Sequence, residues 1–143
     1  MLTMVDPVSV RGWEDFYQFG EAYLKTAQGG QKRPHIFTPE ILYNICGMSI
    51  ENFFMAWLAW QGHLPENHTL RDLTSAAEKL AEVPKDLKMR LSRMDQFQEI
   101  CSLIQYSRRT PNPADVLEFL DLTTCVKTFV LEHKLPTWLI VQQ

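Results

Sequence analysis

The polar stretch ENHTLRDL, residues 66–73, places a histidine and an arginine at the expected start of a helix. His68 stands directly before Thr69, and the spacing of Thr69 and Asp72 is that of a capping box with Asp in place of Glu or Gln. Arg71 then falls in the first turn, where the helix dipole disfavours a cation by roughly 0.3–1 kcal/mol. Free backbone N–H groups, a guanidinium and an imidazole could together bind an anion. The alternative needs no ligand: His68 packs on its own helix and Arg71 extends into solvent.

A second group of candidate ligands lies in YSRRTPNP, at the expected end of a later helix. Arg108 and Arg109 could contact a phosphate, and Tyr106 is the nearest aromatic side chain for a base. Cations at a helix C-terminus also complement the dipole without any ligand. If the two polar segments meet, the predicted nucleotide- or anion-binding surface consists of His68, Arg71, Tyr106, Arg108 and Arg109.

The basic residues of the segment 85–93 form a third candidate. Lys85, Lys88, Arg90 and Arg93 could touch a polyanion, but at helical spacing they do not share one face. A solvated surface is the favoured explanation for them, and nucleic-acid binding stays open.

Several other chemistries lack their residue patterns. Cys46, Cys101 and Cys125 are far apart, odd in number and form no Cys-x-x-Cys, which favours buried free thiols over a disulfide framework or a zinc site. The sequence has no Glu-x-x-His pair of the kind that binds metal in helical bundles, and no glycine-rich phosphate loop. We therefore expect no metal, no cofactor and no catalytic residue.

Composition indicates a soluble protein. The 143 residues, 16.7 kDa, suit one domain spanning 1–143, and the net charge of −3 provides no overall field for nucleic acid. The N-terminus does not resemble a signal peptide, and the apolar run from Phe53 to Trp60 is far shorter than the ~20 residues that span a bilayer. We expect a reduced, cytoplasmic protein that contacts no membrane.

The elements that must position these residues are all helices. Apolar side chains recur at three- and four-residue steps in five segments, and the expected helices cover about 11–30, 39–61, 70–80, 84–106 and 113–135. Thr38-Pro39 and Asn112-Pro113 are predicted starts, and Gly62 is a predicted stop. The fold class is therefore all-α, an up-and-down bundle of four main helices plus one short helix.

The run FFMAWLAW is apolar around the whole circumference of its expected helix, which exceeds one core-facing stripe. A central buried position in the bundle would explain part of this pattern. A homodimer face formed by Phe53, Phe54, Trp57 and Trp60 would explain the remainder, and both explanations stay open.

The order of these features resembles that of the HEPN domain, a helical bundle whose members are variously linked to nucleotide binding, RNA cleavage and pairing with minimal nucleotidyltransferases. Glu51 on the second helix matches the glutamate of the family's Glu-x-x-x-Lys pattern, with Met55 at the lysine position. The other matching positions are His68, Leu70 and Leu73 for its His-x-Leu-x-x-Leu turn, and Tyr106, Arg109 and Pro111 for its Tyr…Arg-Tyr-Pro segment, with Thr110 at the second aromatic.

The resemblance implies a non-catalytic domain that acts as a homodimer and binds a nucleotide or a minimal nucleotidyltransferase, in a toxin–antitoxin-like pair. One alternative is a structural or protein-interaction module without a small ligand. Another is an RNA-cleaving HEPN ribonuclease, but that branch uses an arginine followed four to six residues later by a histidine, and no arginine here has a histidine at that spacing.

The missing Arg–His pair leads to a first prediction. Because no arginine and histidine are spaced to reach one scissile phosphate, the purified protein should not cleave a mixed single-stranded RNA without metal. Gel analysis of the RNA after incubation, with Arg71→Ala in parallel, measures this. Robust cleavage that disappears in Arg71→Ala would contradict the prediction.

Overall fold

The computed structural model describes residues 5–63, 65, 69–103 and 110–133, and all regular structure in these ranges is helical. The elements in chain order are α1 (Val5–Gly30), α2 (Pro39–Gln61), α3 (Leu70–Glu78), α4 (Lys85–Leu103) and α5 (Pro113–Glu132). The predicted all-α class, with four long helices and one short one, is confirmed.

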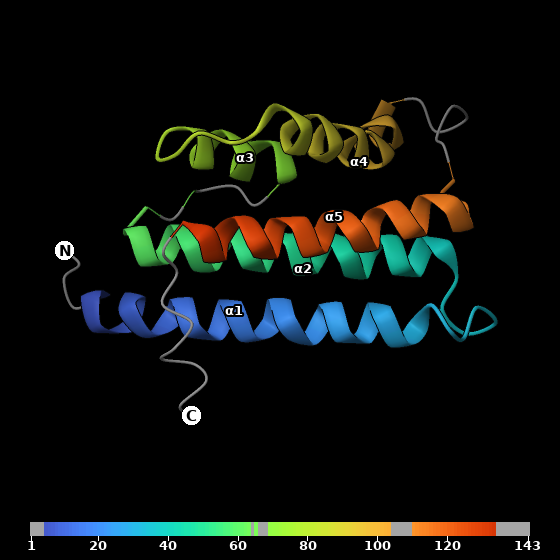
Figure 1. The fold of residues 1–143 in the computed structure, drawn as a ribbon, viewed down its shortest axis with the longest axis horizontal. Coiled ribbons are helices and arrows are strands. Elements are labelled where there is room, and N and C mark those ends of the chain that lie inside the picture. Colours follow the sequence, from blue (N-terminus) through green and yellow to red (C-terminus); the bar gives the residue numbers. More distant parts are fainter. Residues whose placement is uncertain (1–4, 64, 66–68, 104–109, 134–143) are drawn as a thin grey trace.

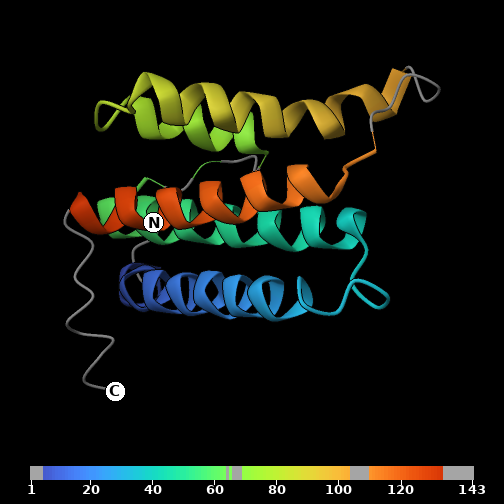
Figure 2. The same cartoon turned by 45° about the vertical axis from the view of Figure 1, so that its right-hand side comes forward.

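The helices form layers around α2. α1 and α2 run antiparallel as a pair, α5 lies beside α2, and α3 and α4 lie together across the far side of α2 from α1 (Figures 1 and 2). Helix α2 contacts α1, α3 and α5. It is therefore the element on which the other layers assemble.

Local capping residues set the helix boundaries. The Thr38 side chain accepts a hydrogen bond from the Ile41 backbone N–H at 3.2 Å, and Gly62 ends α2 with a φ of 79°, a left-handed conformation that suits glycine. At α5 the Asn112 side chain accepts from the Asp115 N–H, and the Asp115 carboxylate accepts from the Asn112 N–H, both at 2.9 Å. The predicted starts at Pro39 and Pro113 and the stop at Gly62 are confirmed.

The apolar segment 53–59 of α2 is buried within a single chain. Phe53 contacts Tyr17 of α1, with ring centroids 5.5 Å apart, while Phe54 and Trp57 contact Phe129 of α5 at 6.4 and 5.6 Å. Every residue from 53 to 59 is buried. The central position of α2 thus accounts for the apolar run.

This placement changes the predicted dimer face. Phe53, Phe54 and Trp57 have at most 1% of their surface exposed, so they offer no area to a second copy. Trp60 differs because it is 40% exposed and meets Trp13 of α1 edge to face. The dimer itself stays a prediction, but these three buried side chains no longer argue for it.

The third helix is shorter than the predicted segment 70–80. Leu70, Leu73 and Ala77 are buried, but Leu80 is 37% exposed. The reason is that α3 ends at Glu78, so Leu80 lies in the following turn and not on the helix face.

Buried hydrogen bonds fix the register between helices. The Ser49 hydroxyl donates to the Gly20 carbonyl at 2.7 Å, which joins α2 to α1, and the Tyr43 hydroxyl donates to the Met94 carbonyl at 3.0 Å, which joins α2 to α4. Each of these bonds has a fixed direction, whereas apolar contacts tolerate sliding. The bundle therefore has one defined alignment of its helices.

The described helices include none that combines the length and apolar character needed to cross a membrane.

The close approach of α1 and α2 leads to a second prediction. An added Cβ at Gly20 would lie 2.8 Å from ring atoms of Phe53, whereas one at Gly12 would meet nothing within 4 Å. Gly20→Ala should therefore lower the free energy of unfolding by about 1–2 kcal/mol, overpacking outweighing the gain in helix propensity. Gly12→Ala should raise it by about 0.5–1 kcal/mol. Chemical denaturation measures the free energy of unfolding of both variants. Equal stabilisation by the two substitutions would show that a Cβ at Gly20 does not clash with Phe53.

Candidate functional site

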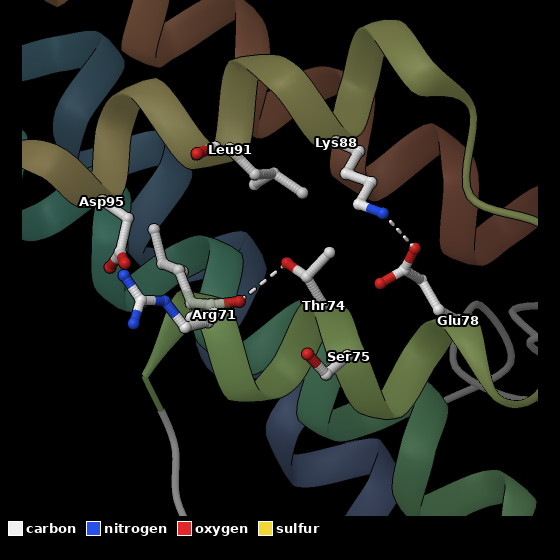
Figure 3. Close-up of a pocket in the computed structure, with 9 residues that line it drawn as sticks. Arg71, Thr74, Ser75, Glu78, Lys88, Leu91 and Asp95 are labelled. Atoms are coloured by element: carbon white, nitrogen blue, oxygen red, sulfur yellow. Dashed lines mark hydrogen bonds and ion pairs between the residues drawn. The ribbon is translucent and has the colours of Figure 1, made fainter.

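A pocket lies between α3 and α4, and Arg71 of α3 lines it (Figure 3). Its volume is about 140 Å³, and both helices supply polar and charged side chains to its wall. The lining residues are Leu70, Arg71, Thr74, Ser75, Glu78, Lys88, Leu91, Ser92 and Asp95.

Arg71 faces a carboxylate across this pocket. The side chains of Arg71 and Asp95 point toward one another, from the first turn of α3 and from the middle of α4 (Figure 3). Asp95 is only 7% exposed. Burial raises the pKa of the Asp95 carboxyl, the positive charge of Arg71 lowers it, and the negative charge of Asp72 raises it.

The opposed charges explain why a cation is tolerated at a helix start. The unfavourable interaction of Arg71 with the α3 dipole is worth at most about 1 kcal/mol, and a nearby buried carboxylate offsets it. The start of α3 is also capped within the chain. The Thr69 side chain accepts a hydrogen bond from the Asp72 N–H at 3.1 Å and donates one to the Asp72 carboxylate at 2.8 Å. No external anion is required for this helix start to be stable.

The other end of the pocket is closed by an ion pair. Lys88 Nζ of α4 lies 2.6 Å from Glu78 Oε2 of α3 (Figure 3). The Thr74 hydroxyl donates to the Leu70 carbonyl one turn earlier, at 2.7 Å, and so is engaged within its own helix. The pocket thus contains two sets of opposite charges, Arg71 with Asp95 and Lys88 with Glu78. Each set has one residue on α3 and the other on α4.

Arg90 plays the corresponding role between α4 and α5. Its guanidinium donates to Glu118 at 2.7 and 3.1 Å and to Asp121 at 2.6 Å, and one nitrogen lies 3.3 Å from the Cys125 sulfur. The basic segment 85–93, predicted as a possible polyanion surface, therefore does not present its cations together. Lys88 forms an ion pair with α3, and Arg90 forms ion pairs with α5. Two of its four cations are used in contacts between helices.

The structure describes only one member of the predicted anion surface. Arg71 lines the pocket, while His68, Tyr106, Arg108 and Arg109 lie outside the described residues. Their convergence on one surface stays a prediction.

Sequence reasoning missed Asp95. The unusual position of Arg71 was a signal that a carboxylate could lie nearby, but 17 acidic residues could have supplied it. The choice of Asp95 depends on how α3 packs on α4.

The described thiols do not form a reactive or metal-binding cluster. Cys46 is fully buried, and burial raises the pKa of its thiol to about 11, which disfavours the nucleophilic thiolate. Cys125 is partly buried beside Arg90, and Cys101 has no described side chain. Among the described residues, no three His, Cys, Asp or Glu side chains are grouped as metal ligands would be.

Comparisons with protein-family models, with curated proteins and with solved structures gave no significant match to this chain. The HEPN resemblance therefore rests on the residues quoted for it.

The burial of Asp95 leads to a third prediction. Because its pKa is raised in the folded state, its contribution to stability is fully present below the unfolded pKa and is lost as pH rises through the folded pKa. Asp95→Asn cannot ionise, so its free energy of unfolding relative to the wild type should increase as pH rises from the unfolded pKa of about 4 to the folded pKa of Asp95, and should be constant above it.

Denaturant titrations at several pH values measure this margin, with Asp15→Asn on the exposed surface of α1 as control. Arg71→Ala should also destabilise the wild type more than it destabilises Asp95→Asn, because only the wild type would retain a buried carboxylate without its cation. A margin independent of pH would show that the environment of Asp95 does not perturb its titration.

Proposed function

We propose that this chain is a non-catalytic, HEPN-like helical binding domain that acts as a homodimer in the cytoplasm and engages a protein partner. The observation that carries the proposal is the charge pairing of the α3–α4 pocket. Glu78 and Lys88 form an ion pair there, and Arg71 faces Asp95. The cations of this pocket already face carboxylates, so they are less available to the phosphates of a free nucleotide. This supports a domain that binds a protein partner over one that binds a nucleotide.

The size of the pocket supports the same function. Its volume of about 140 Å³ is well below the roughly 300–1,000 Å³ of most small-molecule sites. A single phosphate-sized group or one side chain of a partner would fill it. For the class of partner, the resemblance suggests a minimal nucleotidyltransferase, an argument by analogy of fold.

Nucleotide binding is the second candidate, and one observation favours it. Arg71 and Lys88 line the same pocket together with Ser75 and Ser92. A phosphate there could gain charge-assisted hydrogen bonds of about 1.5–3 kcal/mol each before the costs of binding. Such an anion would compete with Asp95 and Glu78 for the two cations, and residues outside the described part would have to hold the base.

A calorimetric titration separates the two candidates and is the fourth prediction. ATP, GTP, CTP and UTP should give no saturable heat with the wild type or with Arg71→Ala. Asp95→Asn makes the test more sensitive, because it removes the negative charge that faces Arg71. Heat with any nucleotide that increases in Asp95→Asn and is lost in Arg71→Ala would replace the proposed function with the second candidate.

The homodimer is tested separately by sedimentation of the full chain. Its mass at micromolar concentration should be twice 16.7 kDa. A species of 16.7 kDa at those concentrations would remove the homodimer from the proposal.

A further inference from the structure

The end of α1 and the loop that follows it present three exposed cations. The loop projects at one end of the bundle (Figures 1 and 2). Lys25 lies near the end of α1, and Lys32 and Arg33 lie in the loop. Within the described part of the chain, none of the three forms an ion pair. The cations that join helices elsewhere each pair with a carboxylate: Lys88, Arg90 and Lys127.

The backbone places the two lysines on one face. The Gln31 N–H donates to the Ala27 carbonyl at 2.9 Å and the Lys32 N–H to the Gly29 carbonyl at 3.2 Å, so helical bonding continues beyond the end of α1. Lys25 and Lys32 are seven positions apart, which is nearly two full turns. They therefore point to the same side, about 10 Å apart along the helix axis.

The surface between the two lysines is open because Gly29 lies there. Gly29 is about one turn from each lysine, it is exposed, and an added Cβ would meet nothing within 4 Å. With no side chain at this position, the backbone of a bound segment can approach the helix closely. The face formed by Lys25, Gly29, Lys32 and Arg33 is here called the basic surface.

The loop part of the basic surface has a defined shape. The Phe37 ring packs on Gly30, where an added Cβ would lie 2.6 Å from it, and the Arg33 guanidinium lies 5.9 Å from the centroid of the same ring. The N–H groups of Ile36 and Phe37 both donate to the Arg33 carbonyl, at 3.0 and 2.9 Å. A surface that is ordered before binding loses less conformational entropy when a partner binds.

We propose that the basic surface binds an acidic segment of the protein partner; this rests on the protein-partner part of the proposed function. Carboxylates of such a segment would gain charge-assisted hydrogen bonds to Lys25, Lys32 and Arg33. No carboxylate of the described chain has to be displaced from these cations. Arg71 and Lys88 of the α3–α4 pocket differ in this respect, because they already face carboxylates.

Two observations favour a protein segment over a nucleic acid or an anionic membrane. Ile36 is 48% exposed in the same loop, and it offers an apolar contact that a phosphate backbone cannot return. The chain carries a net charge of −3, so the molecule apart from Lys25, Lys32 and Arg33 carries −6. A long nucleic acid or a membrane would extend past the basic surface and meet this negative charge, whereas a short acidic segment would contact the cations alone.

Binding of labelled decaglutamate to the full chain, measured by fluorescence anisotropy, is the fifth prediction. The peptide should bind saturably at low ionic strength and more weakly as salt is added, because the cations are exposed. Lys25→Glu and Lys32→Glu should each raise the dissociation constant at least about tenfold, since each replaces an attraction with a repulsion. Lys85→Glu makes the same charge change at an exposed lysine of α4 and should bind like the wild type.

Gly29 provides a second variant that keeps all three cations. Gly29→Glu places a carboxylate one turn from Lys25 and from Lys32, where it can pair with both. It should therefore raise the dissociation constant for decaglutamate at least about tenfold. Gly29→Ala fills the same position without a charge and should bind like the wild type. Circular dichroism should show the same helix content in every variant.

Mixed single-stranded RNA and vesicles containing phosphatidylserine are titrated in parallel. No saturable binding of decaglutamate, or an equal loss in Lys85→Glu, would overturn this site and leave the protein partner to another surface. Unchanged binding in Gly29→Glu would also overturn it. Tighter binding of the RNA or the vesicles than of decaglutamate would overturn both this site and the protein-partner part of the proposed function.

Discussion

The fold depends on the need to bury residues 53–59 of helix α2 on every side. Seven consecutive residues, from 53 to 59, are buried, although one neighbouring helix can cover only one stripe of another. Helices α1 and α5 cover two sides of this segment, and α3 contacts α2 as well. The central place of α2 follows from this requirement, and it fixes which surfaces of the other helices are left free.

The two halves of the bundle are held together differently. α1 packs closely on α2, where Gly20 lies against the Phe53 ring and Ser49 bonds to the Gly20 carbonyl. The α3–α4 layer combines apolar contacts with a buried hydrogen bond from Tyr43 to the Met94 carbonyl and with ion pairs of Lys88 to Glu78 and of Arg90 to α5. Exposed ion pairs contribute little to stability, so the apolar contacts stabilise this layer while the paired charges define its orientation.

The charges that first suggest an anion site therefore have a structural use. Arg71 and Lys88 face carboxylates from the opposite helix, and a ligand would have to displace those carboxylates. Phe19 of α1 and Met48 of α2, by contrast, are apolar side chains that are 56% and 42% exposed. This contrast is why the proposed function is centred on a protein interaction, with nucleotide binding as the second candidate.

Local sequence rules predicted the helices, but they did not predict the contacts between the helices. Thr38, Gly62 and Asn112 act within one turn of their own position, so the sequence by itself determined these three helix boundaries, and periodicity determined the all-α class. The partner of Arg71, the burial of Phe53, Phe54 and Trp57 within one chain, and the exposure of Phe19 and Met48 were decided only by the tertiary structure. Each depends on which face of one helix meets which face of another, and this choice is set by packing between segments distant in sequence.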